Sequence, residues 1–311
     1  MSRVYEALQR SQGDQPSASP LGSDQPEEVA VGATGAALAT AEATDTNWLN
    51  VSADRVLHPV PAPEQRLVAI SEPEGTGAEM FRVLATRLAH MQNKRRLQKL
   101  LVTSSVVDEG KSVVAVNLAL TLARRPDTRV LLVEADLRRP TAGALLSTSA
   151  LTGISEWSEG KLPLENSLYQ IRDLPMWFLA AGHPLDHPLP LLESDRFAKM
   201  LDAIASSFDW ILLDATPMLP MADSTSLARL CDGVLVVVRE GVTRRKILNK
   251  AIASIEKSKL VGVVFNQASM LNIDYKHYYG GSNSSGKSKK ELKKEAKKAQ
   301  KEANQVKAAS A

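Results

Sequence analysis

The chain has 311 residues but only one cysteine, Cys231. A single cysteine cannot form a disulfide framework, so we expect a protein of a reducing compartment. Cys231 precedes the apolar run Gly233–Val238, and packing at the start of a strand is its expected role, because no neighbouring group would activate its thiol. The sequence also lacks a run of roughly 18 to 20 apolar residues and a signal-peptide core. These absences predict a cytoplasmic protein, unless a partner or a surface contact recruits it to the inner face of the cell membrane.

Apolar periodicity is missing at both ends of the chain. From Ser11 to about Pro73 the residues are mainly Ala, Gly, Ser, Thr, Pro and acidic residues, a composition that buries too little apolar area to offset chain entropy. Residues 1–76 are therefore predicted to form a short helix, either a docking peptide or a frayed end, followed by a disordered leader. Residues 271–311 are predicted to form a separate tail, which includes the basic, helix-prone stretch Lys287–Lys307 without an apolar stripe.

Between these ends, residues 77–270 alternate between apolar runs and helical patterns. Helical spacing of apolar residues covers Glu79–Leu100, Ser112–Arg124 and Thr243–Ser258. Short, continuous apolar runs are typical of strands in a parallel sheet that is covered on both faces. The pattern predicts a doubly wound α/β domain with a mostly parallel sheet. The predicted strands are Leu100–Thr103, Arg129–Val133, Trp210–Leu213, Gly233–Val238 and Leu260–Phe265.

A phosphate-binding loop is predicted where the first of these strands passes into a helix. The stretch from Thr103 to Ser112 ends in Gly110-Lys111-Ser112, and its position between a strand and a helix is the setting that a P-loop requires. Amides at the helix N-terminus point at the phosphates, the Lys111 ammonium reaches the β and γ phosphates, and the Ser112 hydroxyl binds Mg²⁺. Gly110 lets the backbone approach closely. The expected nucleotide contacts are Asp108, Glu109, Gly110, Lys111, Ser112 and Val113.

Gly-Lys-Ser alone is a weak signal, and Ser105 stands where the general pattern has its first glycine. Its weight comes from two strand ends that carry carboxylates: Glu134 and Asp136 follow one apolar run, and Asp214 follows another. The carboxyl edge of an α/β sheet is where such folds bind ligands, and carboxylates there can hold Mg²⁺ or orient an attacking hydroxyl. Either acidic segment alone would indicate turn residues at a strand end. All three segments in this order predict a site for ATP and Mg²⁺.

These three segments resemble those of the bacterial tyrosine kinases of capsule and exopolysaccharide loci, often called BY-kinases. Their Walker A loop, their second acidic strand of the form Asp-x-Asp and their Walker B strand ending in Asp-x-x-Pro correspond to the stretches around Lys111, Asp136 and Asp214. The resemblance covers about residues 77–280. The opening Met-Ser-Arg-Val-Tyr-Glu-Ala-Leu is also similar to the start of kinases from exosortase-associated exopolysaccharide loci. The match continues through Ala222-Asp223, Thr243-Arg244-Arg245 and Gly262-Val263-Val264-Phe265-Asn266.

The resemblance implies an ATP-dependent protein-tyrosine autokinase with a ParA/MinD-like P-loop fold, which regulates polymerisation and export of an exopolysaccharide or capsule. Lys111 and Ser112 would bind the phosphates and Mg²⁺, and Asp214 would help to hold the metal. Glu134 and Asp136 would position or activate the incoming tyrosine hydroxyl, with Glu134 also counted among the metal ligands.

The resemblance also implies partners. Tyr275, Tyr278 and Tyr279 are similar to the C-terminal autophosphorylation cluster of the family, in which the tail of one subunit enters the active site of its neighbour. A transmembrane polysaccharide co-polymerase would be the activator. The family's oligomerisation pattern Glu-x-x-Arg-x-x-Arg is represented here by Glu79 and Arg82, so a homo-oligomer is expected.

Three positions depart from the family pattern. Val107-Asp108 stands where the family usually has Pro-Gly, so a carboxylate lies in the phosphate loop. It would oppose the phosphates if it pointed inward, and it would cost little if it pointed outward. Glu134 replaces an aspartate and lengthens that arm by one methylene. Ala85 replaces the second arginine of the oligomerisation pattern.

Other interpretations stay open. A ParA/MinD-like regulatory ATPase has the same fold, although its signature lysine is Val106 in this chain. A catalytically weak scaffold for the co-polymerase would bind ATP without phosphotransfer. The tyrosines could form an aromatic patch, and the Lys-rich tail could be a solvated helix or bind an anionic membrane surface, at about 1 kcal/mol per lysine. Nucleic acid is not expected, because the aromatic residues are not interleaved with the lysines.

Overall fold

The computed structural model describes residues 49–62, 65–147, 150–219 and 221–268. Eight strands form one sheet within these residues: β1 (Val56–Leu57), β2 (Lys99–Ser104), β3 (Val130–Glu134), β4 (Leu168–Ile171), β5 (Met176–Leu179), β6 (Trp210–Asp214), β7 (Gly233–Arg239) and β8 (Leu260–Asn266). Their order in the sheet is β1-β4-β5-β3-β6-β2-β7-β8. Strands β5, β3, β6, β2, β7 and β8 run parallel, β4 pairs antiparallel with β5, and β1 runs parallel to β4.

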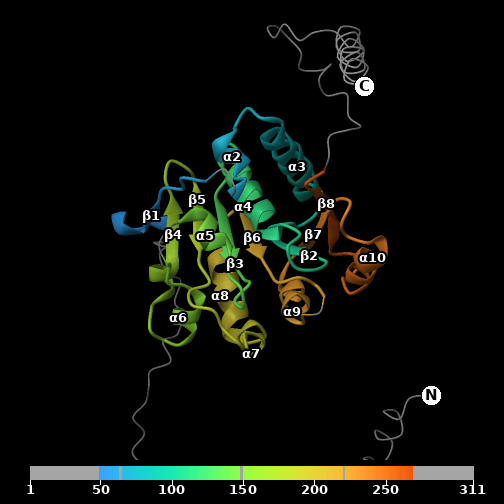
Figure 1. Cartoon of the computed structure of the whole chain (residues 1–311). Coiled ribbons are helices and arrows are strands. Elements are labelled where there is room, and N and C mark those ends of the chain that lie inside the picture. The colour runs from blue at the N-terminus through green and yellow to red at the C-terminus, as the bar shows by residue number, and fades with distance from the viewer. Residues whose placement is uncertain (1–48, 63–64, 148–149, 220, 269–311) are drawn as a thin grey trace, which may run out of the picture. The chain divides into compact units, whose positions relative to one another are not determined.

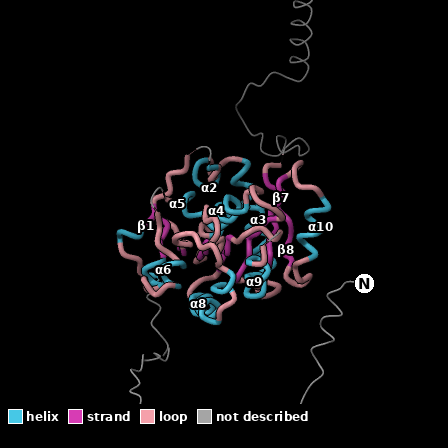
Figure 2. The backbone as a smooth tube through the Cα atoms, turned by 60° about the horizontal axis from the view of Figure 1, so that its bottom comes forward, coloured by secondary structure: helices cyan, strands magenta, loops and turns pink. Residues whose placement is uncertain are grey.

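Helices cover both faces of the sheet (Figures 1 and 2). They are α2 (Val68–Ser71), α3 (Thr76–Gln92), α4 (Lys111–Leu122), α5 (Ala142–Leu146), α6 (Ile154–Ser158), α7 (Leu189–Leu192), α8 (Asp195–Ala205), α9 (Asp223–Leu230) and α10 (Arg245–Ala253). Strand residues point alternately to the two faces, so Leu100 and Leu101 of β2 belong to different apolar clusters. The Leu100 cluster includes residues of α2, α3, α4 and α5, and the Leu101 cluster includes residues of α6 to α10. The mostly parallel, doubly wound fold predicted from the sequence is confirmed.

The five predicted strands are all present, and their observed ends differ from the predicted ones by no more than one residue. The predicted helix Glu79–Leu100 is wrong at its C-terminal end, because α3 stops at Gln92. Polar and basic residues from Asn93 to Arg96 follow it, and the chain then enters β2 at Lys99. Cys231 is buried just before β7, where burial raises the pKa of its thiol to about 12.

The prediction of a disordered leader up to Pro73 is wrong for two short segments, residues 53–57 and 68–71. The first forms a 3₁₀ helix (Ala53–Arg55) and β1, and the second forms α2. Composition misses them because only a few apolar side chains are involved and their partners lie elsewhere in the chain. Leu67 and Ala69 are buried in the Leu100 cluster, and β1 gains its partner from β4. We therefore propose that the folded domain begins upstream of the predicted boundary at residue 76.

Strands β3 and β6 end at one level, and their neighbour β2 continues two residues further. Asp214 is the last residue of β6, and it is paired in register with Val102 of β2 and with Glu134 of β3. The loops that leave β2, β3 and β6 therefore meet at the carboxyl edge of the sheet, which is where ligands bind in open α/β folds. Among the described residues, none of the helices combines the length and the apolar character needed to span a bilayer. The predicted opening helix, Tyr275, Tyr278, Tyr279 and the Lys-rich tail lie outside the described residues.

Candidate nucleotide site

The loop between β2 and α4 has the backbone of a phosphate-binding loop. Gly110 caps the N-terminus of the 12-residue helix α4 with a left-handed φ of 86°. A Cβ at this position would also lie 2.1 Å from the Asn266 amide nitrogen, which donates to the Glu109 carbonyl at 3.0 Å. Glycine is therefore required here on two counts. The first turn of α4 contains no acidic residue, so its free amides and helix dipole favour an anion.

Glu109 braces this loop from inside. Its side chain is buried, and its Oε2 accepts hydrogen bonds from the backbone N–H of Ser105 at 2.6 Å and of Val106 at 3.0 Å. The Thr243 hydroxyl, at the beginning of the segment that leads into α10, donates to the other carboxylate oxygen, Oε1. The Glu109 carboxylate thus holds the shape of the loop, and the expected contact of this residue with the nucleotide stays a prediction.

Asp108 occupies the left-handed region with a φ of 62°, and its side chain is exposed. Aspartate tolerates this region better than most residues other than glycine, which explains how it can stand where the family usually has glycine. Val107 beside it is 56% exposed. The carboxylate therefore lies at the open rim of the loop, in contact with solvent.

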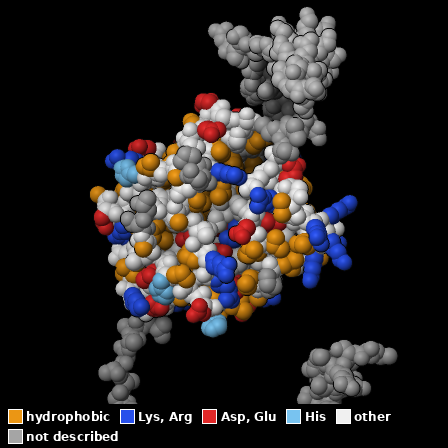
Figure 3. All heavy atoms as spheres, viewed as in Figure 1, with side chains coloured by type: hydrophobic (Ala, Val, Ile, Leu, Met, Phe, Trp, Pro, Cys, Tyr) orange, Lys and Arg blue, Asp and Glu red, His pale blue; other side chains and the backbone are white. Residues whose placement is uncertain are grey.

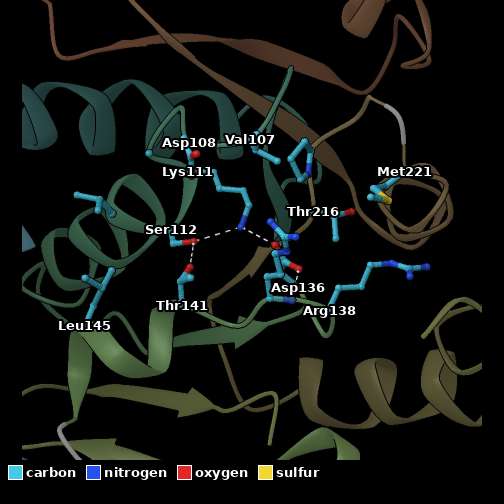
Figure 4. A pocket seen from close by; sticks show the side chains of 14 residues that line it. Val107, Asp108, Lys111, Ser112, Asp136, Arg138, Thr141, Leu145, Thr216 and Met221 are labelled. Atoms are coloured by element: carbon cyan, nitrogen blue, oxygen red, sulfur yellow. Dashed lines mark hydrogen bonds and ion pairs between the residues drawn. The ribbon is translucent and has the colours of Figure 1, made fainter. Parts of the chain in front are cut away.

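Lys111, Ser112 and Asp136 converge at the site (Figure 4), and Asp214 lies beside Lys111. The Lys111 ammonium lies 2.8 Å from Oδ2 of Asp136 and 3.6 Å from Oδ1 of Asp214. It also donates to the Ser112 hydroxyl oxygen at 3.2 Å. Thr141, just before α5, donates its hydroxyl to the same oxygen at 2.8 Å. One cation thus faces two carboxylates and a hydroxyl at the edge of three strands.

The charges of this group are strongly coupled. Burial alone would lower the pKa of Lys111, but the carboxylates of Asp214 and Asp136 raise it above its ordinary value. Burial raises the pKa of Asp214, and the Lys111 charge only partly opposes this shift. The site therefore places the Asp214 carboxylate, which has too few partners to offset its burial, beside a Lys111 side chain that stays charged.

Asp214 offers the clearest fit to a metal ion. Neither of its carboxylate oxygens accepts a hydrogen bond from a described residue, although both are buried. A buried oxygen without a hydrogen bond is expected to meet an ion or water, and the Ser112 hydroxyl would offer a second hard oxygen ligand. No cluster of three or more His, Cys, Asp and Glu side chains in the described part of the chain could hold a metal. Mg²⁺ commonly binds through few protein ligands together with phosphates and water.

Glu134 is not turned toward Lys111. Its Oε1 accepts from the backbone N–H of Gly143 at 3.0 Å, and its Oε2 accepts from that of Ala181 at 3.2 Å. Burial raises the pKa of this carboxyl, and these amide donors oppose the shift. Glu134 therefore ties β3 to the start of α5 and to the end of β5, whereas Asp136, two residues later, reaches the cavity.

A cavity of about 450 Å³ opens beside Lys111. Val113, one of the expected contacts, and Arg138 both line this cavity. The Arg138 guanidinium contacts the buried carboxylate of Asp223 at 2.6 Å and donates to the Asp186 carbonyl at 2.7 Å. The lining residues are Val107, Asp108, Gly110, Lys111, Ser112, Val113, Asp136, Arg138, Arg139, Thr141, Leu145, Thr216, Pro217 and Met221.

The expected oligomerisation residues lie on α3. Glu79 and Arg82 form an ion pair at 2.7 Å within the helix, and Arg82 also donates to the Pro73 carbonyl at 2.7 Å. Both side chains are partly exposed. Ala85, which stands in place of the second arginine, is buried in the Leu100 cluster.

Sequence reasoning assigned no role to Thr141, Thr243 and Asn266, which support the site. Thr141 is separated from its partner Ser112 by 29 residues, Thr243 from Glu109 by 134, and Asn266 from Glu109 by 157. Thr243 and Asn266 fall in stretches that match the family, which is the one signal that could have pointed to them.

No family model matches the chain. The tyrosine-protein kinase YwqD of Bacillus subtilis (strain 168) is 27% identical over 219 residues, which cover 70% of this chain and 92% of YwqD. The succinoglycan biosynthesis transport protein ExoP of Rhizobium meliloti (strain 1021) is 28% identical over 235 residues, which cover 70% of this chain but only 30% of ExoP. The solved BceF tyrosine kinase domain is 26% identical, with a TM-score of 0.57 over 70% of this chain and 93% of the domain. With its phosphate-binding loop and acidic strand ends, the chain is similar in sequence and fold to bacterial tyrosine-protein kinases.

Proposed function

We propose that the chain is an ATP-dependent protein-tyrosine kinase that phosphorylates its own tyrosines and regulates exopolysaccharide or capsule polymerisation and export. The observation that carries this proposal is the position of Lys111, which lies between Asp136 and Asp214 and beside Ser112 at the edge of three strands. Similarity to YwqD supports the reaction, and similarity to ExoP supports the link to polysaccharide export.

The geometry of the loop and of the strand ends supports an assignment of the residues that would bind ATP and Mg²⁺. Amides of the loop around Gly110 and at the start of α4 would hold the phosphates, with Lys111 on the terminal ones. Ser112 and Asp214 would hold Mg²⁺, which would neutralise phosphate charge and so favour transfer. Asp108 and Val113 would border the nucleotide, and Glu109 would keep the loop in shape.

Asp136 is the proposed catalytic base. In the transfer, the tyrosine oxygen forms a bond to the γ phosphorus while the bond to the oxygen that bridges the β and γ phosphates breaks. The phenolic proton passes to Asp136, and ADP leaves with the bridging oxygen. Lys111 holds Asp136 in place before substrate binds, and Glu134 acts as a positioning residue that fixes the end of β3. Catalysis would thus be positioning and charge neutralisation.

The acceptors and partners complete the proposal. Tyr275, Tyr278 and Tyr279 are the proposed phosphate acceptors, delivered from a neighbouring copy in an oligomer to which Glu79 and Arg82 contribute. A transmembrane polysaccharide co-polymerase is the proposed activator and would recruit the kinase to the inner face of the membrane. The basic tail would add a contact with anionic lipid.

Incubation of the full chain with Mg-ATP, followed by phosphotyrosine mapping with mass spectrometry, tests this function. Phosphate is expected on the three tail tyrosines. It should be lost in Lys111→Met and Asp136→Asn, and a triple Tyr→Phe variant at the tail should remove the sites. Absence of phosphotyrosine, even with the cytoplasmic segment of a co-polymerase added, would exclude the kinase. Retained ATP binding would then favour the scaffold, since Val106 in place of the signature lysine argues against a ParA/MinD-like switch.

A further inference from the structure

The edge of the domain at α10 carries a dense group of positive charges. Six cations and two carboxylates lie between residues 239 and 257. Figure 3 shows Lys and Arg side chains projecting together from this edge. Four of these residues are exposed and form no ion pair with any other described residue. We call them the α10 cation cluster: Arg244, Arg245, Lys246 and Lys250.

The positive charges of the α10 cation cluster lie at the end of the helix where the helix dipole disfavours them. Arg244 is the N-cap of α10, Arg245 and Lys246 lie in the first turn, and the first turn contains no acidic residue. The N-terminus of a helix is its positive end, so cations there are unfavourable, and acidic residues are the usual choice. A sequence that breaks a local stability rule in this way is expected to do so for a function. The arrangement indicates an anionic partner.

Exposed apolar side chains lie at the same end of α10. Val242, in the loop between β7 and α10, is 64% exposed, and Phe265, near the end of β8, is 59% exposed. The N–H of Glu240 donates to the Asn266 carbonyl at 3.0 Å, which joins this loop to the end of β8. Buried Ala251 anchors the opposite side of α10 to the Leu101 cluster. Cations and apolar side chains therefore face solvent together.

We propose that the α10 cation cluster, with Val242 and Phe265, docks the folded domain on an anionic phospholipid surface. Cations beside exposed apolar groups are the combination that binds the headgroup region of a membrane. Lys246 and Lys250 are one helical turn apart, so both can meet headgroups when α10 lies along the surface. A nucleic acid would use the cations but has no need of exposed Val242. This docking surface is separate from the Lys-rich tail and does not depend on phosphotransfer.

The docking surface adjoins the nucleotide loop. Thr243 lies between Val242 and Arg244, and its hydroxyl donates to the buried Glu109 carboxylate that braces the loop. A membrane contact at α10 therefore lies within a few residues of the proposed ATP site. The docking proposal rests on the proposed function only for the physiological use of the surface, because lipid binding can be measured without kinase activity.

Co-sedimentation of the full chain with vesicles tests the docking surface. Vesicles of phosphatidylglycerol and phosphatidylcholine are compared with vesicles of phosphatidylcholine alone, at 0.15 M salt. The test variant changes all four residues of the α10 cation cluster to Gln. A matched control makes the same charge change at Arg87, Lys94, Arg172 and Lys199, which are exposed elsewhere on the domain. A second control changes the tail residues Lys289, Lys290, Lys293 and Lys294 to Gln.

The cluster variant is expected to bind anionic vesicles at least about 50-fold more weakly, from about fivefold per cation near the surface. The cluster substitutions should weaken binding both in the otherwise native chain and in a chain that also carries the four tail substitutions. The control with Arg87, Lys94, Arg172 and Lys199 changed should bind within about threefold of the native chain. The thermal stability of the cluster variant should not fall, because its substitutions remove cations from the N-terminus of α10. Val242→Ser should weaken binding severalfold at raised salt. Native-like vesicle binding by the cluster variant, or loss confined to the tail control, overturns the proposal. So does a native chain that binds an oligonucleotide through the cluster but not anionic vesicles.

Discussion

Replacement of Lys111 by Met, the usual way to inactivate such a site, should also destabilise the protein. Lys111 is 13% exposed, and it faces the 6% exposed Asp136 and the fully buried Asp214. Its removal leaves two buried carboxylates without the cation. Breaking a buried pair from one side costs about 3 to 5 kcal/mol, and the cavity beside Lys111 favours the lower figure, about 3 kcal/mol. For a domain of about 150 to 250 residues, this predicts a Tm lower by roughly 6 to 12 °C.

Asp214→Asn should reverse much of this loss. The amide removes one buried charge at nearly constant volume, so Lys111→Met/Asp214→Asn should unfold at a higher temperature than Lys111→Met. Asp214→Asn alone should be neutral or stabilising, although it abolishes phosphotransfer. Thermal unfolding without nucleotide, followed by circular dichroism, gives the stability of the native chain, the two single variants and the double variant. A Lys111→Met variant as stable as the native chain, or a double variant no more stable than Lys111→Met, would refute the account of coupled charges.

The pH dependence gives an independent check on the same reasoning. Burial raises the pKa of Asp214 in the folded state above its ordinary value of 3.8, so the folded state holds this proton more tightly than the unfolded state. The resulting penalty is present above the raised pKa and disappears as pH falls through it. Without Lys111 the pKa of Asp214 should rise further, so the stability deficit of Lys111→Met should shrink as pH falls through this raised pKa toward the ordinary value of 3.8. Asp214→Asn should lack this part of the pH dependence.

Three further substitutions test the loop. Asp108→Asn removes the rim carboxylate while keeping a residue that tolerates the left-handed region. The affinity for Mg-ATP, measured by calorimetry, should therefore rise about two- to fivefold. An unchanged affinity would show that the carboxylate points away from the phosphates. Gly110→Ala meets both the strained φ and the Asn266 amide, so it should abolish ATP binding with the fold retained in circular dichroism; tight binding would contradict the loop geometry. Thr243→Val leaves an oxygen of the buried Glu109 carboxylate without its donor, which costs about 1.5 to 3 kcal/mol; Thr243→Ser, which keeps the hydroxyl, should lose far less.

The parts of the fold that could be predicted are those that one continuous segment encodes. A short apolar run such as Gly233–Val238 specifies a buried strand by itself, and the strand, loop and helix around Lys111 specify a phosphate loop. Strand β1 could not be found this way, because its two residues become a strand only by pairing with β4 across more than a hundred positions. The same holds for Thr243 and Asn266, whose partner Glu109 is 134 and 157 residues away.

The division of labour between Glu134 and Asp136 shows where pattern reasoning stops. The two acids lie two residues apart, and the family pattern treats them as one unit at the end of a strand. Glu134 is the last residue of β3, so the sheet still dictates the direction of its side chain, and it meets the amides of Gly143 and Ala181. Asp136 lies beyond the sheet, where the chain has turned toward Lys111. The longer arm of Glu134 therefore makes a structural contact, and Asp214 and Asp136 are left as the proposed residues for the metal and proton chemistry.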